Sequence, residues 1–75
     1  MDRYFEVHSK ASCPYCLAAK ELLRKKKESF TINNDKSPEW STWPCIYLVE
    51  NGNRTLIGGY TELVSYYYAQ FGDII

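Results

Sequence analysis

The chain has 75 residues, with nine Lys or Arg against nine Asp or Glu and therefore a formal net charge of zero. A chain of this length is expected to form one domain, residues 1–75, whose limited core leaves no room for a large active-site cavity. The absence of net positive charge argues against nucleic acid or a membrane surface as partner. The basic run Arg24–Lys27 is interpreted as a solvated helix end.

The location of the protein is suggested by its start and by its cysteines. Met1–Tyr4 lead into a mixed stretch without the apolar run of a signal peptide, and no segment could span a bilayer. We therefore expect a cytoplasmic protein, whose thiols are kept reduced. The three cysteines are Cys13, Cys16 and Cys45. Their odd number and the close spacing of the first two favour metal or redox chemistry over structural disulfides.

The first half of the chain predicts a strand, a helix and a strand. Residues rich in β-formers predict strands over Arg3–Ser9 and Ser29–Ile32. Between them, a helix is predicted from Pro14, which suits a first helical turn, to about Lys27. Its apolar stripe is expected to comprise Leu17, Ala18, Leu22 and Leu23. This unit should be parallel and right-handed.

The second half predicts two strands and a helix. Polar residues 33–41 are expected to hold one helical turn around Pro38–Trp40. Cys45–Val49 and Arg54–Ile57 are predicted to pair across the Asn51-Gly52-Asn53 turn, and Gly58-Gly59 to end the second of these strands. The last helix is predicted over Tyr60–Phe71, with Thr61 as its N-cap and Gly72 as its stop. Together the elements predict an α/β fold with a four-stranded mixed sheet.

Cys13-Pro14-Tyr15-Cys16 lies where the first strand gives way to the helix. The unpaired N–H groups of a helix N-terminus favour a thiolate on the first cysteine, and Lys10 could add a nearby positive charge. Cys16 should lie one turn along, beneath the first sulfur. We therefore interpret Cys13 as the exposed nucleophile and Cys16 as the resolving thiol. The alternative is half of a zinc site, for which only Cys45 and His8 could complete the four ligands.

Two further segments are candidate parts of a binding site. Pro44 after Trp43 could follow a cis peptide bond that brings the chain close to the dithiol, so that an extended substrate pairs with the backbone of Trp43. Gly58–Glu62 combines a pair of glycines, which let a ligand approach the backbone, with a helix N-terminus that could hold a carboxylate. The alternative for Trp43-Pro44 is an ordinary start of a strand, and the alternative for Gly58–Glu62 is an ordinary turn between a strand and a helix.

The order of these motifs along nearly the whole chain resembles the glutaredoxin family, and the compact length is similar to that of phage or viral members. The resemblance implies a thioredoxin-like fold whose sheet has the spatial order second, first, third, fourth strand. It implies an enzyme, a glutathione–disulfide oxidoreductase, with Cys13 and Cys16 as catalytic residues. Glutathione would serve as co-substrate, without a tightly bound cofactor or metal.

The resemblance also implies how glutathione would be bound. Lys10 would meet its glycine carboxylate, Tyr15 would lie along the tripeptide, and the backbone of Trp43 before a cis Pro44 would pair with its cysteinyl part. The γ-glutamyl end would be held by a second group of residues, which comprises Gly59, Tyr60, Thr61 and Glu62.

The sequence departs from the family's pattern at several positions. The bulky Trp43 is expected to narrow or reshape the groove. The segment between Phe30 and Thr42 is short, so a helix that normally helps to hold the glycine carboxylate should be truncated and glutathione affinity lower. Cys45 is interpreted as a packing residue, with a redox role as its alternative, and His8 as a strand-end residue.

Three functional hypotheses follow. The first is a monomeric enzyme that reduces protein disulfides or glutathione mixed disulfides. The second is a short redoxin that is reduced by thioredoxin reductase and donates electrons to ribonucleotide reductase. The third is an iron–sulfur carrier dimer, which Pro14 disfavours by the same resemblance.

Overall fold

The computed structural model describes residues 3–72, so both ends of the predicted domain, residues 1–2 and 73–75, lie outside the described residues. The elements are β1 (Arg3–His8), α1 (Pro14–Lys25), β2 (Phe30–Asn33), β3 (Cys45–Glu50), β4 (Asn53–Gly58) and α2 (Tyr60–Phe71). Strand and helix follow one another as the sequence pattern predicts, and α2 has the predicted bounds.

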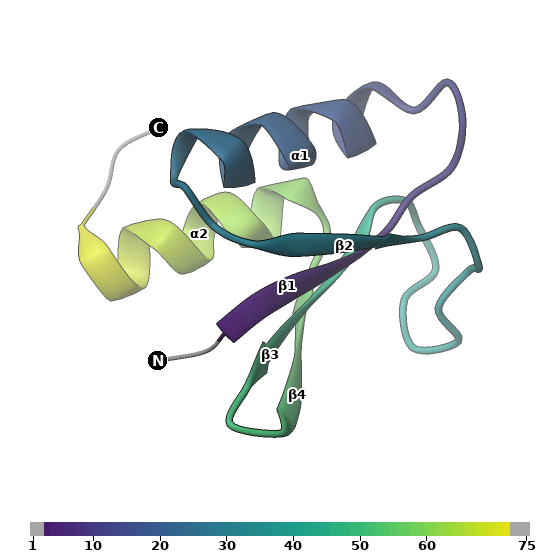
Figure 1. The fold of residues 1–75 in the computed structure, drawn as a ribbon. Coiled ribbons are helices and arrows are strands. Elements are labelled where there is room, and N and C mark those ends of the chain that lie inside the picture. The colour runs from purple at the N-terminus through teal and green to yellow at the C-terminus, as the bar shows by residue number, and fades with distance from the viewer. Residues whose placement is uncertain (1–2, 73–75) are drawn as a thin grey trace.

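The four strands form one mixed sheet in the order β2-β1-β3-β4, as expected (Figure 1). β1 runs parallel to β2, with Phe5 opposite Phe30, and antiparallel to β3. β3 and β4 form an antiparallel hairpin with an irregular register at Ile46 and Tyr47. The connection from β1 through α1 to β2 is therefore the predicted parallel unit.

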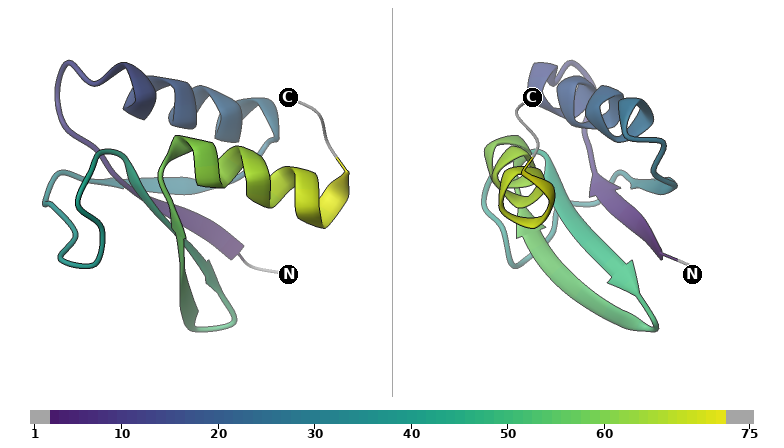
Figure 2. Two further views of the ribbon diagram at one scale, coloured as in Figure 1. Left: turned by 180° about the vertical axis from the view of Figure 1, so that it is seen from behind. Right: turned by 90° about the vertical axis from the view of Figure 1, so that its left-hand side faces the viewer.

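Both helices cover the same face of the sheet, which leaves the other face without a helix (Figure 2). The core lies between these layers. Its buried members come from the helix-facing side of β1 and β3 and from both helices, and comprise Phe5, Val7, Ala19, Leu22, Leu23, Ile46, Leu48, Leu63 and Tyr67. Alternate residues of a strand point to opposite faces, so Glu6, His8 and Tyr47 belong to the open face.

The structure corrects the predicted apolar stripe of α1. Its buried residues are Cys16, Ala19, Leu22 and Leu23. Leu17, which was assigned to the stripe, is 54% exposed. The buried face of the helix differs from the predicted one because the sheet and α2 cover the side that carries Cys16. Leu17 lies outside that side.

Other corrections concern the ends of elements and the middle loop. β1 ends at His8 and α1 at Lys25, with Lys27 in the left-handed region at φ 59°. Residues 34–44 contain a turn at Pro38–Glu39 and no helix, so the shortened segment lacks even the predicted helical turn. A helical turn is weakly specified by so few residues, and side-chain contacts described below hold this loop instead.

The last helix ends as predicted, with Gly72 in the left-handed region at φ 70°. Its three consecutive tyrosines are divided between core and surface, since Tyr67 is buried and Tyr68 is 62% exposed. No helix within residues 3–72 combines the length and apolar character needed to cross a membrane.

Candidate active site

The dithiol lies where the chain leaves β1 and enters α1. Cys13 is the N-cap of the helix, Pro14 occupies its first turn, and the backbone N–H of Cys16 donates to Cys13 Sγ at 3.2 Å. Ser12 adopts a left-handed conformation at φ 58°, which turns the chain immediately before the cysteine. The helix N-terminus therefore directs a donor at the sulfur of Cys13, as the spacing predicts.

The two sulfurs are in different environments. Cys13 is partly exposed, whereas Cys16 is buried. Burial raises the pKa of the Cys16 thiol, and its hydrogen bond with Cys13 raises that pKa further. Cys16 therefore stays protonated, whereas the outer sulfur, Cys13 Sγ, accepts a backbone N–H. The two thiols of the motif therefore differ in burial and in hydrogen bonding, and their catalytic roles belong to the proposed function below.

The segment before β3 lies beside the dithiol. The Trp43–Pro44 peptide bond is cis, and Pro44 is buried. Cys45, the first residue of β3, is paired with His8, the last residue of β1, so both segments leave the sheet at the same end. A hollow between them is lined by both parts of the chain, namely Lys10, Ser12, Cys13, Pro14, Ser41, Thr42 and Trp43.

The turn from β4 to α2 forms another part of this end of the molecule. Gly58 has φ 121°, and a Cβ there would lie 2.8 Å from Cβ and Cγ of Glu62. Gly59, and not Thr61 as predicted, is the N-cap, and its N–H donates to Glu62 Oε1 at 2.9 Å. One carboxylate oxygen of Glu62 thus completes the helix start. The cap is supplied by the third residue of the helix because glycine has no side chain to offer.

A groove next to the dithiol, here called the α2 groove, joins most of the predicted binding residues. It is lined by Tyr15, Thr42, Trp43, Pro44, Gly59, Tyr60, Thr61 and Glu62. The rings of Tyr15 and Tyr60 face each other with centroids 6.0 Å apart. Lys10 is not in this groove and lies instead in the adjoining hollow with Cys13. Trp43 and Thr42 line both spaces and connect them.

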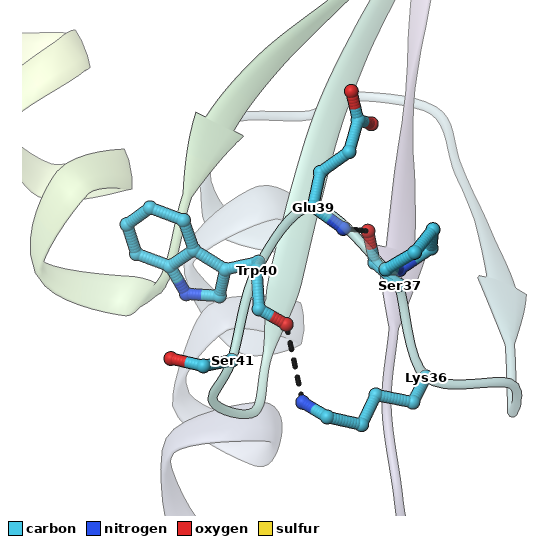
Figure 3. A pocket seen from close by; sticks show the side chains of 6 residues that line it. Lys36, Ser37, Glu39, Trp40 and Ser41 are labelled. Atoms are coloured by element: carbon cyan, nitrogen blue, oxygen red, sulfur yellow. Dashed lines mark hydrogen bonds between the residues drawn. The ribbon is translucent and has the colours of Figure 1, made fainter.

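Trp40 supports this site and was not singled out from the sequence. Its indole Cη2 lies 3.2 Å from the position that a Cβ on Gly58 would take, and its Nε1 is buried without a hydrogen-bond partner within residues 3–72. Residues 36–41, Trp40 included, line a separate hollow without a cysteine, in which Lys36 Nζ donates to the Trp40 carbonyl at 3.1 Å (Figure 3). The sequence signal that could have identified Trp40 as a supporting residue is a large aromatic side chain among the polar residues of this loop.

Neither His8 nor Cys45 forms a metal site with the dithiol. Cys45 is buried, as expected of a packing residue. The His8 ring nitrogens lie 2.7 Å from the Asp35 carbonyl oxygen and 2.8 Å from Glu6 Oε2, on the open face of the sheet. Within residues 3–72, no three or more His, Cys, Asp or Glu side chains are grouped as a metal ion requires. The zinc alternative therefore lacks a ligand set in this part of the chain.

Comparison with known families decides what this geometry belongs to. The model of the glutaredoxin family matches residues 5–52, which include the dithiol and Pro44. The chain belongs to the glutaredoxin family. Membership makes this glutaredoxin a thiol–disulfide oxidoreductase. The matched residues end before Gly58–Glu62, so the α2 side of the groove lies beyond the family match.

A solved structure agrees with the fold of this glutaredoxin. It is similar to Glutaredoxin 1 from Francisella tularensis, crystallised with cacodylate, with a TM-score of 0.70 and 23% identity over 96% of this chain and 100% of that one. At this identity the likeness shows the thioredoxin-like fold. The comparison with curated proteins found no match.

Proposed function

We propose that this glutaredoxin is a glutathione-dependent enzyme that reduces protein disulfides or glutathione mixed disulfides, with Cys13 as nucleophile and Cys16 as resolving thiol. The observation that carries the proposal is that the partly exposed Cys13, whose sulfur accepts a backbone N–H, lines a hollow that shares Thr42 and Trp43 with the α2 groove. That groove combines the backbone segment before β3, which could pair with a peptide, with a helix N-terminus, which could hold a carboxylate.

The residues suggest how the tripeptide would be bound. The backbone of Trp43 would pair with its cysteinyl part, and the N–H groups at the start of α2, at Tyr60 and Thr61, would hold the γ-glutamyl carboxylate. Glu62 would meet the γ-glutamyl amine through the carboxylate oxygen that does not cap Gly59. Lys10 would meet the glycine carboxylate from the adjoining hollow.

The reaction is a two-electron exchange. The Cys13 thiolate attacks one sulfur of the substrate disulfide, a mixed disulfide forms as the substrate S–S bond breaks, and the departing sulfur takes up a proton. Cys16 then loses its proton and attacks Cys13 Sγ, which releases the second substrate thiol and leaves a Cys13–Cys16 disulfide. Two glutathione thiols return the two electrons and two protons, and end as glutathione disulfide.

A second candidate is a redoxin that is reduced by thioredoxin reductase and that could serve ribonucleotide reductase. The observation that favours it is the 34–44 loop, which contains no helix to help hold the glycine end of glutathione.

Turnover with purified reductases tests the proposal. We expect the protein to support NADPH oxidation by glutathione and glutathione reductase, with the mixed disulfide of glutathione and cysteamine as substrate. Thioredoxin reductase in place of glutathione and its reductase should give at most a few per cent of that rate. The reverse ratio would contradict glutathione dependence and support the second candidate, while family membership as a thiol–disulfide oxidoreductase would stand.

A further inference from the structure

A second groove reaches Cys13 from the side of α1 and is not used by the proposed glutathione site, apart from Lys10 and Cys13 themselves. This α1 groove is lined by Lys10, Ala11, Ser12, Cys13, Pro14, Leu17 and Lys20. It shares no residue with the lining of the α2 groove. Cys13 also lines the hollow that shares Thr42 and Trp43 with the α2 groove, so different molecules could approach its sulfur from these two directions.

The floor of the α1 groove is apolar and exposed. Ala11 and Pro14 are exposed, and Leu17 is exposed over 54% of its surface although it lies one turn from the reactive sulfur. Removing apolar surface from water is favourable, so a partner that covers Leu17 gains binding free energy. Together with Ala11 and Pro14, Leu17 offers an apolar contact surface for a side chain of a bound partner.

The rim of the α1 groove is positively charged. Lys10 and Lys20 line it, and its lining contains no acidic side chain. Within residues 3–72, neither lysine forms an ion pair with a carboxylate. Glu21, the adjacent acid on the helix, lines a different hollow together with Lys25. The molecule as a whole is neutral, so this is a local concentration of positive charge and not a general property of the surface.

We propose that the α1 groove binds the disulfide-bearing segment of a protein substrate, and that it selects a segment with an apolar side chain and acidic residues beside the disulfide. The inference rests on the proposed function for the identity of the reaction. The substrate segment lies against Leu17 and between the lysines, and one of its sulfurs reaches Cys13, as the exchange described above requires. Glutathione then approaches from the α2 groove.

Single-turnover reduction of designed peptides tests this inference. Three peptides carry the same intramolecular disulfide next to a leucine, flanked by acidic, neutral or basic residues. We expect the reduced wild-type protein to reduce the acidic peptide about tenfold faster than the basic one at low ionic strength, with the ratio falling as salt is added. Lys20→Glu should invert the order of the two charged peptides, and Leu17→Ala should slow all three several-fold.

Lys25→Glu is the matched control, because it changes the net charge equally on the same helix but outside the α1 groove. It should leave the peptide order unchanged, and Lys20→Gln provides an intermediate variant if charge reversal impairs folding. Equal rates for the three peptides, or equal effects of the Lys20 and Lys25 variants, would overturn the inference. The reduced protein needs no glutathione in a single turnover, so a failure of glutathione recycling would contradict the proposed function without altering this comparison.

Discussion

The two cysteines of the motif are one helical turn apart and yet have opposite surroundings. Cys13 caps α1 and lines the α1 groove and the adjoining hollow, whereas Cys16 is 1% exposed and its pKa is raised first by burial. In the proposed mechanism, a protonated, buried Cys16 does not compete for the substrate and lies behind the mixed disulfide that it would resolve. The proposed roles therefore rest on the difference in environment between two chemically identical side chains.

Replacing each cysteine separately should therefore give different losses. Cys13→Ser should abolish reduction of every disulfide, to below about 1% of wild type, because the hydroxyl is not a nucleophile for this exchange. Cys16→Ser should retain reduction of glutathione mixed disulfides, since glutathione itself can resolve the intermediate, and lose most reduction of protein disulfides. Steady-state rates on both substrate classes measure this. Full protein-disulfide reduction by Cys16→Ser would show that Cys16 is not the resolving thiol.

Among the elements, the start of α2 depends most on contacts from elsewhere in the chain. Gly58 is at φ 121° with Glu62 against it on one side and the Trp40 ring on the other. Glu62 in turn accepts the Gly59 N–H. The helix N-terminus proposed to hold a carboxylate is thus positioned by a glycine without room for a side chain and by an indole from the middle loop.

Gly58→Ala should both destabilise the fold and weaken the proposed glutathione site. The positive φ and the 2.8 Å approach of Glu62 make an added methyl group unfavourable, by about 2 kcal/mol. Gly59→Ala is the matched control, because Cβ there meets Glu62 Oε1 at 3.2 Å without a positive φ. Chemical denaturation and the KM for glutathione measure the two effects. A Gly58→Ala protein as stable as Gly59→Ala would contradict this account of the turn.

On the scale of the whole molecule, the open face of the sheet is held by a polar network centred on Glu6. Its carboxylate accepts Arg54 Nε from β4 at 3.1 Å and lies beside His8, which also contacts the loop carbonyl of Asp35. Asn33 of β2 donates to the same carboxylate at 3.5 Å. The network thus joins three strands and the middle loop on the face without a helix.

Stability should fall in acid as Glu6 becomes protonated. Burial opposes its ionisation, but Arg54 and then His8 outweigh burial and lower the pKa of the Glu6 carboxyl. Because the carboxyl has a lower pKa in the folded protein than its value of about 4.3 in the unfolded chain, its ionised form stabilises the fold at pH above this value. This stabilisation is lost as the pH falls through the pKa of the folded state. Glu6→Gln should lower the free energy of unfolding by about 1 kcal/mol at pH 7. On acidification to pH 3, the variant should lose less of its free energy of unfolding than the wild type.

Denaturant titrations at both pH values measure this difference. Glu50→Gln, on β3 and outside the network, is the control and should behave as wild type. If Glu6→Gln kept the full acid sensitivity of wild type, the network would not be its source.

Local features of the sequence determined the elements and the position of the dithiol. Cys13-Pro14-Tyr15-Cys16 could be placed at a helix start because a cap and a proline act within one turn. The Asn51-Gly52 pair predicted the hairpin, and both residues adopt the positive φ that such a turn requires, 54° and 80°. These signals depend on residues that are adjacent in sequence, so they can be read without knowing the tertiary contacts.

Only the tertiary structure decided which faces are covered. Periodicity alone assigned Leu17 to the core, but the positions of the sheet and α2 bury the face with Cys16 and leave Leu17 beside the nucleophile. Likewise, the sequence predicts Thr61 as the N-cap of α2, whereas in the structure Glu62 accepts the N–H of Gly59. Trp40 contacts the same turn although it is distant in sequence. Such contacts depend on how elements pack, and packing is a property of the assembled layers that no local pattern encodes.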